Sequence, residues 1–120
     1  MIPRSVNLVK EGKSPVIYGD GEQTRDFTYV TDIVSALIAA AESTKTNKIY
    51  NVGSDTTISI NKIVELLGGD KVNIPKRPGE PDCTYADITK ARNELDYQPQ
   101  VNIETGIKEF VKWYREMNQA

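Results

Sequence analysis

The sequence contains no histidine, one cysteine and one tryptophan in 120 residues. Without histidine there is no imidazole for acid–base catalysis, for a Ser-His triad or for a His-ligated metal site. The single thiol, Cys83, allows no internal disulfide and no cysteine-rich zinc site, which fits a reducing compartment. These absences exclude histidine-based catalysis and metal centres built from several thiols.

Long hydrophobic runs and a large net charge are also missing. The longest apolar-rich stretch, residues 33–41, is about half the length of a membrane span. Fifteen basic and seventeen acidic side chains leave a net charge of −2, which gives no general attraction to nucleic acids or acidic membranes. We therefore expect one modest, soluble, cytoplasmic domain without nucleic-acid or membrane partners, in which local geometry holds any bound anion.

The order of the predicted elements indicates an α/β fold with short strands, a hairpin and about five helices. Apolar periodicity predicts helices over residues 2–10, 31–43, 60–67, 87–95 and 102–114. Short apolar runs predict strands over residues 15–18, 25–30, 48–52 and 72–74. A turn at Gly19-Asp-Gly21 separates the first two strands, which predicts that they form a hairpin.

Capping residues mark the ends of several predicted helices. Ser59 precedes one helix and Gly68-Gly69 ends it, while Thr31 is a plausible N-cap for another. Asp32 and Asp87 are interpreted as residues that stabilise helix starts, in preference to catalytic carboxylates.

Two arginines lie at positions where local structure is expected to restrict their side chains before a ligand binds. Arg25 begins a predicted strand and Arg77 lies in a proline-stiffened loop, so each guanidinium loses little freedom on binding. Two such forked donors suit the oxygens of a diphosphate. The alternative is that Arg25 pairs with neighbouring carboxylates and Arg77 is solvated, because surface ion pairs are common and weak.

The pair Gly19-x-Gly21 is not a dinucleotide-binding fingerprint. It lacks the third glycine, and it joins two predicted strands where the fingerprint joins a strand to a helix. We interpret it as a turn.

Three segments carry more defined chemistry than a generic domain requires. They are Tyr18-Gly-Asp-Gly-x-Gln-Thr-Arg-Asp-Phe-x-Tyr-Val-x-Asp32, Tyr50-Asn-Val-Gly53, and Arg77-Pro-Gly-Glu80 followed by Ala86-Asp87. Together they resemble the C-terminal part of the extended short-chain dehydrogenase/reductases that act on nucleotide sugars. UDP-glucose 4-epimerases are nearest in pattern, and dTDP-glucose 4,6-dehydratases and UDP-glucuronate decarboxylases are close. The family usually has Asp in place of Glu80 and Gly-Trp in place of Asp96-Tyr97.

The resemblance implies that residues 1–120 form the nucleotide-sugar-binding C-terminal portion of a Rossmann-type enzyme. It implies that Arg25 and Arg77 clamp the diphosphate of a UDP-sugar. The other substrate-binding residues that it implies are Val16, Ile17 and Tyr18 along the base and ribose, Asn51 and Val52 near the pocket, and Thr84 beside the sugar ring.

The same resemblance implies that the NAD-binding and catalytic motifs lie outside this portion. The family's glycine-rich NAD turn and its catalytic Tyr-x-x-x-Lys pair lie in an N-terminal half, and this sequence contains neither. We therefore expect a chain that is truncated, is not catalytic alone and holds no NAD by itself. Residues of about 31–53 resemble elements that complete the edge of the missing Rossmann sheet, so we expect an apolar face covered by that half or by self-association.

Three functions stay open at this point. The first is the substrate-binding portion of an NAD-dependent UDP-sugar 4-epimerase. The second is the same portion of a 4,6-dehydratase or a decarboxylase. The third is a free-standing, non-catalytic module that binds a nucleotide sugar.

Overall fold

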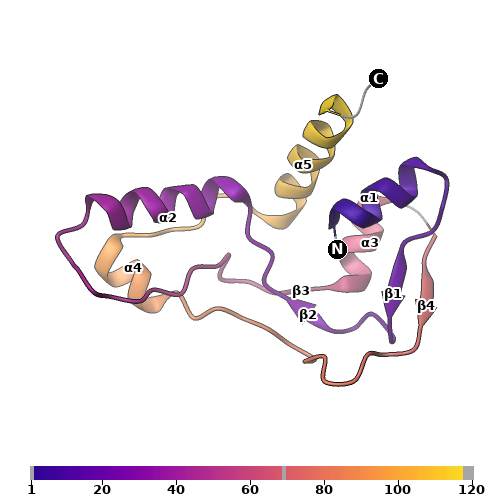
Figure 1. Ribbon diagram of the computed structural model, residues 1–120, viewed down its shortest axis with the longest axis horizontal. Helices are drawn as coiled ribbons and strands as arrows, with labels where there is room; N and C mark the ends of the chain where they lie inside the picture. The colour runs from indigo at the N-terminus through magenta and orange to yellow at the C-terminus, as the bar shows by residue number, and fades with distance from the viewer. Residues whose placement is uncertain (1, 69, 118–120) are drawn as a thin grey trace.

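The computed structural model describes residues 2–68 and 70–117, which form an elongated body of 50 × 38 × 20 Å (Figure 1). The helices over these residues are α1 (Ile2–Lys10), α2 (Val30–Glu42), α3 (Ile60–Leu67), α4 (Thr89–Leu95) and α5 (Ile103–Met117). The strands are β1 (Val16–Tyr18), β2 (Thr24–Arg25), β3 (Ile58–Ser59) and β4 (Val72–Ile74). The predicted α/β class with five helices is confirmed.

The strands pair with partners that lie far along the chain. β1 pairs in parallel with β4, in the register Val16 to Val72 and Tyr18 to Ile74. β2 pairs with β3 in antiparallel, so Arg25 lies opposite Ile58. The predicted hairpin between the first two strands is wrong, because the turn after β1 leads β2 away to β3 while β4 takes the place beside β1.

The predicted strand over residues 48–52 is also wrong, because the structure has no strand there. The side chains of Tyr50 and Val52 pack onto the cluster between α2 and α4. The Ile49 carbonyl accepts a hydrogen bond of 2.9 Å from Nζ of Lys90. A β-strand requires a neighbouring strand to bond with, but the neighbour of this segment is helix α4, so no strand forms.

The helix ends agree with the sequence where capping is local. The hydroxyl of Ser59 accepts from the backbone N–H of Lys62, and Gly68 ends α3 with a φ of +71°, as predicted; Gly69 lies outside the described residues. The prediction for α2 is wrong in detail, since its N-cap is Tyr29, without a side-chain cap. Asp32 lies in the first turn, but its carboxylate accepts from the distant backbone N–H groups of Gln100 and Val101.

Asp87 does act at the start of α4, although Ile88 is the N-cap. Its carboxylate accepts from the backbone N–H of Thr89 at 3.0 Å and from the Thr89 hydroxyl at 2.6 Å. These two bonds hold the pKa of the Asp87 carboxyl below its usual value.

Buried apolar side chains gather in two clusters at opposite ends of the body. One joins Ile17 of β1 to Ile60 and Val64 of α3, and the other joins α2, α4 and Tyr97. The Tyr97 hydroxyl donates to the Gly53 carbonyl at 2.7 Å. Burial, with a smaller contribution from the Asp32 charge, raises the pKa of that hydroxyl.

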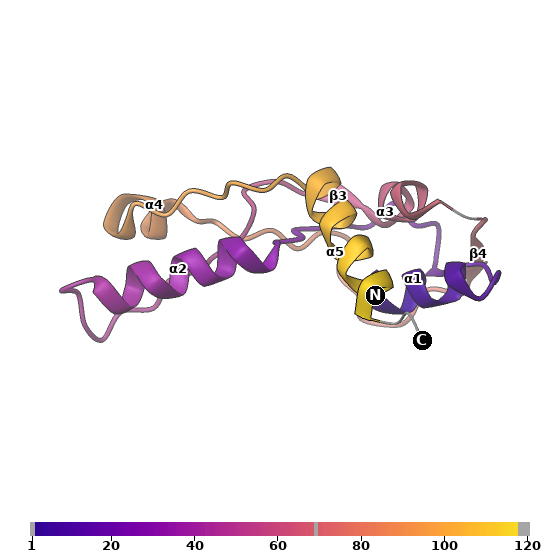
Figure 2. The ribbon, with the colours of Figure 1, turned by 90° about the horizontal axis from the view of Figure 1, so that it is seen from above.

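The two groups of elements lie at opposite ends of the long axis when the molecule is turned (Figure 2). Helices α2 and α4 lie side by side at one end, and α1, α3, β1 and β4 form the other. Helix α5 lies between them and is tied to α1 by the Tyr114 hydroxyl, which donates to Oδ1 of Asn7 at 3.2 Å. Within the residues described, no helix has the length and apolar character that crossing a membrane requires.

Candidate diphosphate-binding site

A cavity of about 350 Å³ opens between α1, β1 and the loop that follows β4. Because β1 and β4 run in parallel, the segments that leave their carboxyl ends emerge at the same edge, and Gly19 N donates to Ile74 O at 2.7 Å. This geometry brings Tyr18 and the Arg77 loop together. The cavity is lined by Arg4, Ser5, Leu8, Val16, Ile17, Tyr18, Gln23, Arg25, Phe27, Ile60, Arg77 and Glu80.

Arg25 is held in place by backbone carbonyls. Its Nη1 donates to Thr24 O at 2.7 Å, and its Nη2 donates to Pro81 O at 2.8 Å. The loop lies alongside β2, where Thr24 N donates to Asp82 O and Thr84 N donates to Thr24 O. The guanidinium is therefore fixed before any ligand arrives, and its side chain is only 20% exposed.

Arg77 stacks on an aromatic ring and remains open to solvent. Its guanidinium carbon lies 4.1 Å from the centroid of the Tyr18 ring, within the range of a cation–π interaction. The Arg77 side chain is 61% exposed. A tight turn with Gly79 at φ +78° follows it, and returns the chain to the cavity at Glu80.

Glu80 connects the two arginines. Its Oε1 lies 3.4 Å from Nη2 of Arg25, and its Oε2 lies 3.6 Å from Nε of Arg77. The ion pairing and the solvation that we considered as the alternative for Arg25 and Arg77 therefore both occur in the chain without ligand. Neither contact removes the guanidiniums from the cavity.

The turn between β1 and β2 supports the wall of the cavity. Gly19 and Gly21 have φ values of +75° and +79°, which glycine adopts readily. Asn61 at the start of α3 donates from its backbone to Gly21 O, and a Cβ at Gly21 would collide with the Asn61 side chain. The interpretation of Gly19-x-Gly21 as a turn is therefore confirmed, although the turn does not close a hairpin.

The predicted site residues fall into two groups. Five of them line the cavity: Val16, Ile17, Tyr18, Arg25 and Arg77. The other three do not.

Asn51 is exposed, Val52 packs toward the α2–α4 cluster, and Thr84 is exposed beside β2. Their contacts with a ligand stay predictions.

Sequence reasoning missed the contribution of α1 to the cavity. Arg4 and Leu8 are four residues apart and so lie on one face of this helix, which was a readable signal. It also missed that Glu80 faces both arginines, which no local pattern shows.

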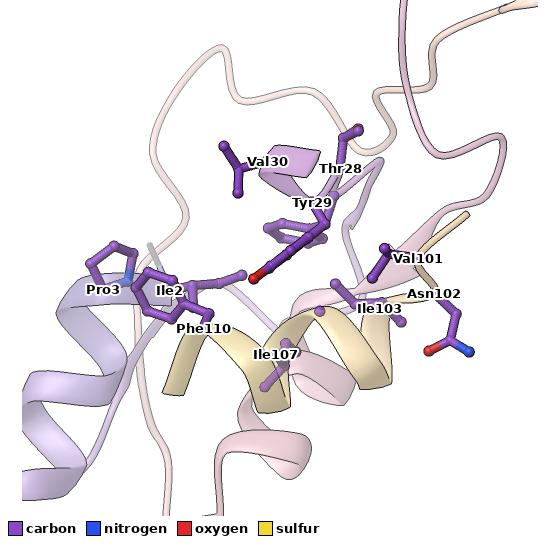
Figure 3. A pocket seen from close by; sticks show the side chains of 12 residues that line it. Ile2, Pro3, Thr28, Tyr29, Val30, Val101, Asn102, Ile103, Ile107 and Phe110 are labelled. Atoms are coloured by element: carbon purple, nitrogen blue, oxygen red, sulfur yellow. The ribbon is translucent and has the colours of Figure 1, made fainter. Parts of the chain in front are cut away.

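A second cavity of about 280 Å³ lies on the other side of Phe27, between α1, α5 and the segment before α2 (Figure 3). Tyr29 crosses it toward Ile2 and Phe110. None of the residues that line it carries a charge, so this cavity offers nothing to balance a phosphate. The described residues also contain no group of three or more acidic or thiol side chains placed to hold a metal ion.

The first cavity can bind an anion with several oxygens next to a flat apolar group. The guanidiniums of Arg25 and Arg77, with that of Arg4 as a third, supply forked donors. The apolar wall is formed by Val16, Ile17, Phe27 and Ile60.

The chain is similar to known proteins over most of its length. Residues 1–110 match the family model described as GDP-mannose 4,6 dehydratase. A UDP-glucuronate 4-epimerase from Thermodesulfobacterium geofontis is 36% identical, over 94% of this chain and 37% of its own length. A UDP-N-acetyl-α-D-glucosaminuronate decarboxylase from Bacillus cytotoxicus is 33% identical, over 98% of this chain and 40% of its own length.

Solved structures give the same result. The UDP-glucuronic acid 4-epimerase from Bacillus cereus, in complex with UDP-glucuronic acid and NAD, matches with a TM-score of 0.90 and 33% identity. That match covers 98% of this chain and 40% of the epimerase, so the chain spans about two fifths of the relatives it matches. The predicted resemblance is confirmed: this chain belongs to the GDP-mannose 4,6-dehydratase family, among the extended short-chain dehydrogenase/reductases that modify nucleotide sugars with NAD.

Proposed function

We propose that this chain binds the diphosphate of a UDP-sugar between Arg25 and Arg77. The observation that carries the proposal is that both guanidiniums line one cavity, one fixed by backbone carbonyls and the other stacked on Tyr18. Arg25 supplies a rigid fork, and the exposed Arg77 closes on the ligand from the opposite side.

The uridine lies along β1 in this proposal. Val16, Ile17 and Tyr18 form the wall next to the arginines, so a base and ribose attached to the diphosphate reach them directly. Thr84, a small residue beside β2, faces the sugar, while Asn51 and Val52 contribute at the margin of the site.

We further propose that the parent reaction is NAD-dependent epimerisation at C4 of the sugar. Support comes from relatives named as 4-epimerases, among them the T. geofontis and B. cereus proteins. A decarboxylase and a dTDP-glucose 4,6-dehydratase match over similar lengths, so the class is better supported than the subtype. In this proposal the residues of this chain bind and orient the substrate, and proton transfer is the task of the family's Tyr-x-x-x-Lys pair, which this sequence does not contain.

The residues present do not fit NAD. A dinucleotide site needs a glycine-rich turn between a strand and a helix, so that backbone N–H groups can approach the phosphates. Within residues 2–68 and 70–117, β3 runs directly into α3 through Ser59 and Ile60, with no glycine between them.

We propose that the outer face of α2 packs against the dinucleotide-binding part of the family fold. Val30, Val34, Leu37 and Ile38 form one stripe along this helix and are 45% to 65% exposed, while Ala36 is buried on the other side. A helix that is apolar on both sides is normally covered on both sides. Residues 31–53 would then complete the edge of that part, since Ile49 nearby is 83% exposed.

An uncovered α2 stripe should bind a hydrophobic dye and promote self-association. We expect the change Leu37→Gln with Ile38→Gln to reduce dye fluorescence by roughly half and to shift the sedimentation profile toward monomer. Met117→Gln, an exposed apolar residue at the end of α5, is the matched control and should change neither. A monomeric wild-type chain without dye binding would contradict the proposal.

Calorimetric titration of the chain with UDP, UDP-glucose, UMP, uridine and NAD tests the diphosphate site. We expect UDP and UDP-glucose to bind with similar affinity, because the clamp holds the diphosphate. UMP should bind at least about tenfold more weakly, since one phosphate cannot engage both forks. Uridine, which has no phosphate, should bind more weakly still. NAD should bind more weakly than UDP, because its diphosphate lacks the uridine that lies along β1. A folded chain that does not bind UDP would contradict the proposal and would also exclude a free-standing binding module.

A further inference from the structure

Three segments that are far apart in the sequence meet at the carboxylate of Asp26, directly after β2. Its Oδ1 accepts from the backbone N–H of Ser54 at 2.8 Å and from the Ser54 hydroxyl at 2.5 Å. Its Oδ2 accepts from the backbone N–H of Ala86 at 3.4 Å. One half-buried side chain therefore connects the end of β2 to the segment after Gly53 and to the end of the loop that carries Arg77.

The junction at Asp26 is closely packed as well as hydrogen-bonded. A Cβ atom on Gly53 would collide with Oδ2 of Asp26 and with the Cβ atom of Ala86. The Tyr97 hydroxyl donates to the Gly53 carbonyl at 2.7 Å, which fixes this backbone from the other side. The glycine thus lies tightly between the carboxylate and Ala86, and a larger residue would separate them.

The bond to Ala86 extends a short ladder between β2 and the loop. Thr24 N donates to Asp82 O, and Thr84 N donates to Thr24 O, which is the pattern of parallel strands. In that pattern the N–H of Ala86 would next bond to the backbone carbonyl of residue 26. The Asp26 carboxylate takes the place of that carbonyl, so the third bond of the ladder depends on a side chain.

The same ladder helps to fix the arginines of the cavity. Arg25 lies between Thr24 and Asp26, and its Nη2 donates to Pro81 O at 2.8 Å, one residue before the ladder begins. Arg77 lies in the same loop, between the ladder and β4, which pairs with β1. The loop is therefore held at both ends. Of the three ladder bonds, the one to Asp26 is the one that a side-chain substitution can remove.

We propose that Asp26 is a positioning residue of the diphosphate site. By holding the end of the loop on β2, it keeps the Pro81 carbonyl against Arg25 and limits the positions that Arg77 can take. The inference rests on the proposed function, because it assumes that a diphosphate binds between Arg25 and Arg77. A loop that is ordered before the ligand arrives does not have to be ordered by the ligand, so the Asp26 junction raises the affinity.

Calorimetry on Asp26→Asn with UDP, inorganic pyrophosphate and uridine tests the proposal. The asparagine amide can still accept from Ser54, but it presents an N–H to the N–H of Ala86, so the third ladder bond is lost. We expect UDP and pyrophosphate to bind about fivefold more weakly than to wild type, with no change for uridine. Ser54→Ala is the matched control, since it removes the hydroxyl but leaves the bond to Ala86. It should stay within about twofold of wild type.

A second control separates positioning from stability. Asp32 is also a carboxylate that accepts from distant backbone N–H groups, those of Gln100 and Val101, but it lies on α2 and does not line the cavity. Asp32→Asn should destabilise the chain and leave the UDP affinity of the folded protein unchanged. Without ligand, the Nε–Hε NMR signal of Arg25 should move toward that of a solvated arginine in Asp26→Asn and stay in place in Asp32→Asn.

Gly53→Ala reaches the same junction without removing a carboxylate, because its Cβ atom forces Asp26 and Ala86 apart. We expect it to weaken UDP binding as Asp26→Asn does. If neither variant folds, amide hydrogen exchange of the wild-type chain provides the test. Coupling between two sites is reciprocal, so UDP should slow the exchange of the Ala86 N–H and not that of the Gln100 N–H.

The outcomes separate the two proposals. Wild-type UDP affinity in the folded Asp26→Asn and Gly53→Ala variants would overturn the positioning role and leave the diphosphate site standing. An equal loss of affinity in Asp32→Asn, or unchanged exchange of the Ala86 N–H at saturating UDP, would overturn it as well. Failure of the wild-type chain to bind UDP or pyrophosphate would overturn both proposals.

Discussion

Replacing Asp32 by alanine is expected to lower the free energy of unfolding by about 2–3 kcal/mol. Asp32 is 2% exposed, and its carboxylate accepts from the backbone N–H of Gln100 at 2.9 Å and of Val101 at 3.1 Å. These bonds join the first turn of α2 to the segment that leads into α5. Alanine would leave both backbone donors without their partner.

Urea unfolding followed by circular dichroism measures this loss. Asp32→Asn should also destabilise, because its amide group can accept from only one of the two donors and presents an N–H to the other. Asp82→Ala is the control, since the Asp82 side chain is 87% exposed and pairs with Lys76, and its effect should be much smaller. An Asp32→Ala variant as stable as wild type would show that the carboxylate does not join these segments.

The combined change Arg25→Ala and Arg77→Ala is expected to weaken UDP binding by at least about 100-fold. Each guanidinium can form a charge-assisted, forked contact with phosphate, and both line the same cavity. Arg25→Ala alone should cost more than Arg77→Ala alone. The reason is that Arg25 is fixed by two carbonyls, whereas the more exposed Arg77 must be ordered by the ligand.

Calorimetry on the two single variants and the double variant measures these losses. Arg25→Lys should not restore the affinity, because an ammonium group lacks the fork that reaches two oxygens. Arg92→Ala is the matched control, since Arg92 pairs with Asp55 and does not line the cavity. Unchanged UDP affinity in the folded double variant would mean that UDP binds elsewhere.

The sequence predicts the local parts of this fold well, and α3 shows why. Its Ser59 cap, its apolar spacing and the glycine that ends it all act within a few residues of one another. Strand pairing is different, because the partner of β1 is β4 and the partner of β2 is β3. Nothing in the turn at Gly19 identifies those partners. The turn therefore predicts a hairpin between β1 and β2, which the structure does not contain.

The candidate site, like the fold, can be predicted from the sequence only where its residues lie close together in the chain. The motif residues from Val16 to Arg25 lie close together in the sequence, and Arg77 joins them because the parallel β1–β4 pair emerges at one edge. The contacts of Glu80 with Arg25 and Arg77 join side chains that meet only after folding. The same is true of the hydrogen bond that Asp32 accepts from the backbone before α5. Such long-range contacts leave no periodic signal in the sequence.

The most direct measurement of the central claim is an NMR titration of the arginine side chains with UDP. We expect the Nε–Hε signals of Arg25 and Arg77 to shift together and to saturate with one dissociation constant, while those of Arg92 and Arg115 stay in place. A titration in which UDP binds but neither the Arg25 nor the Arg77 signal moves would contradict it.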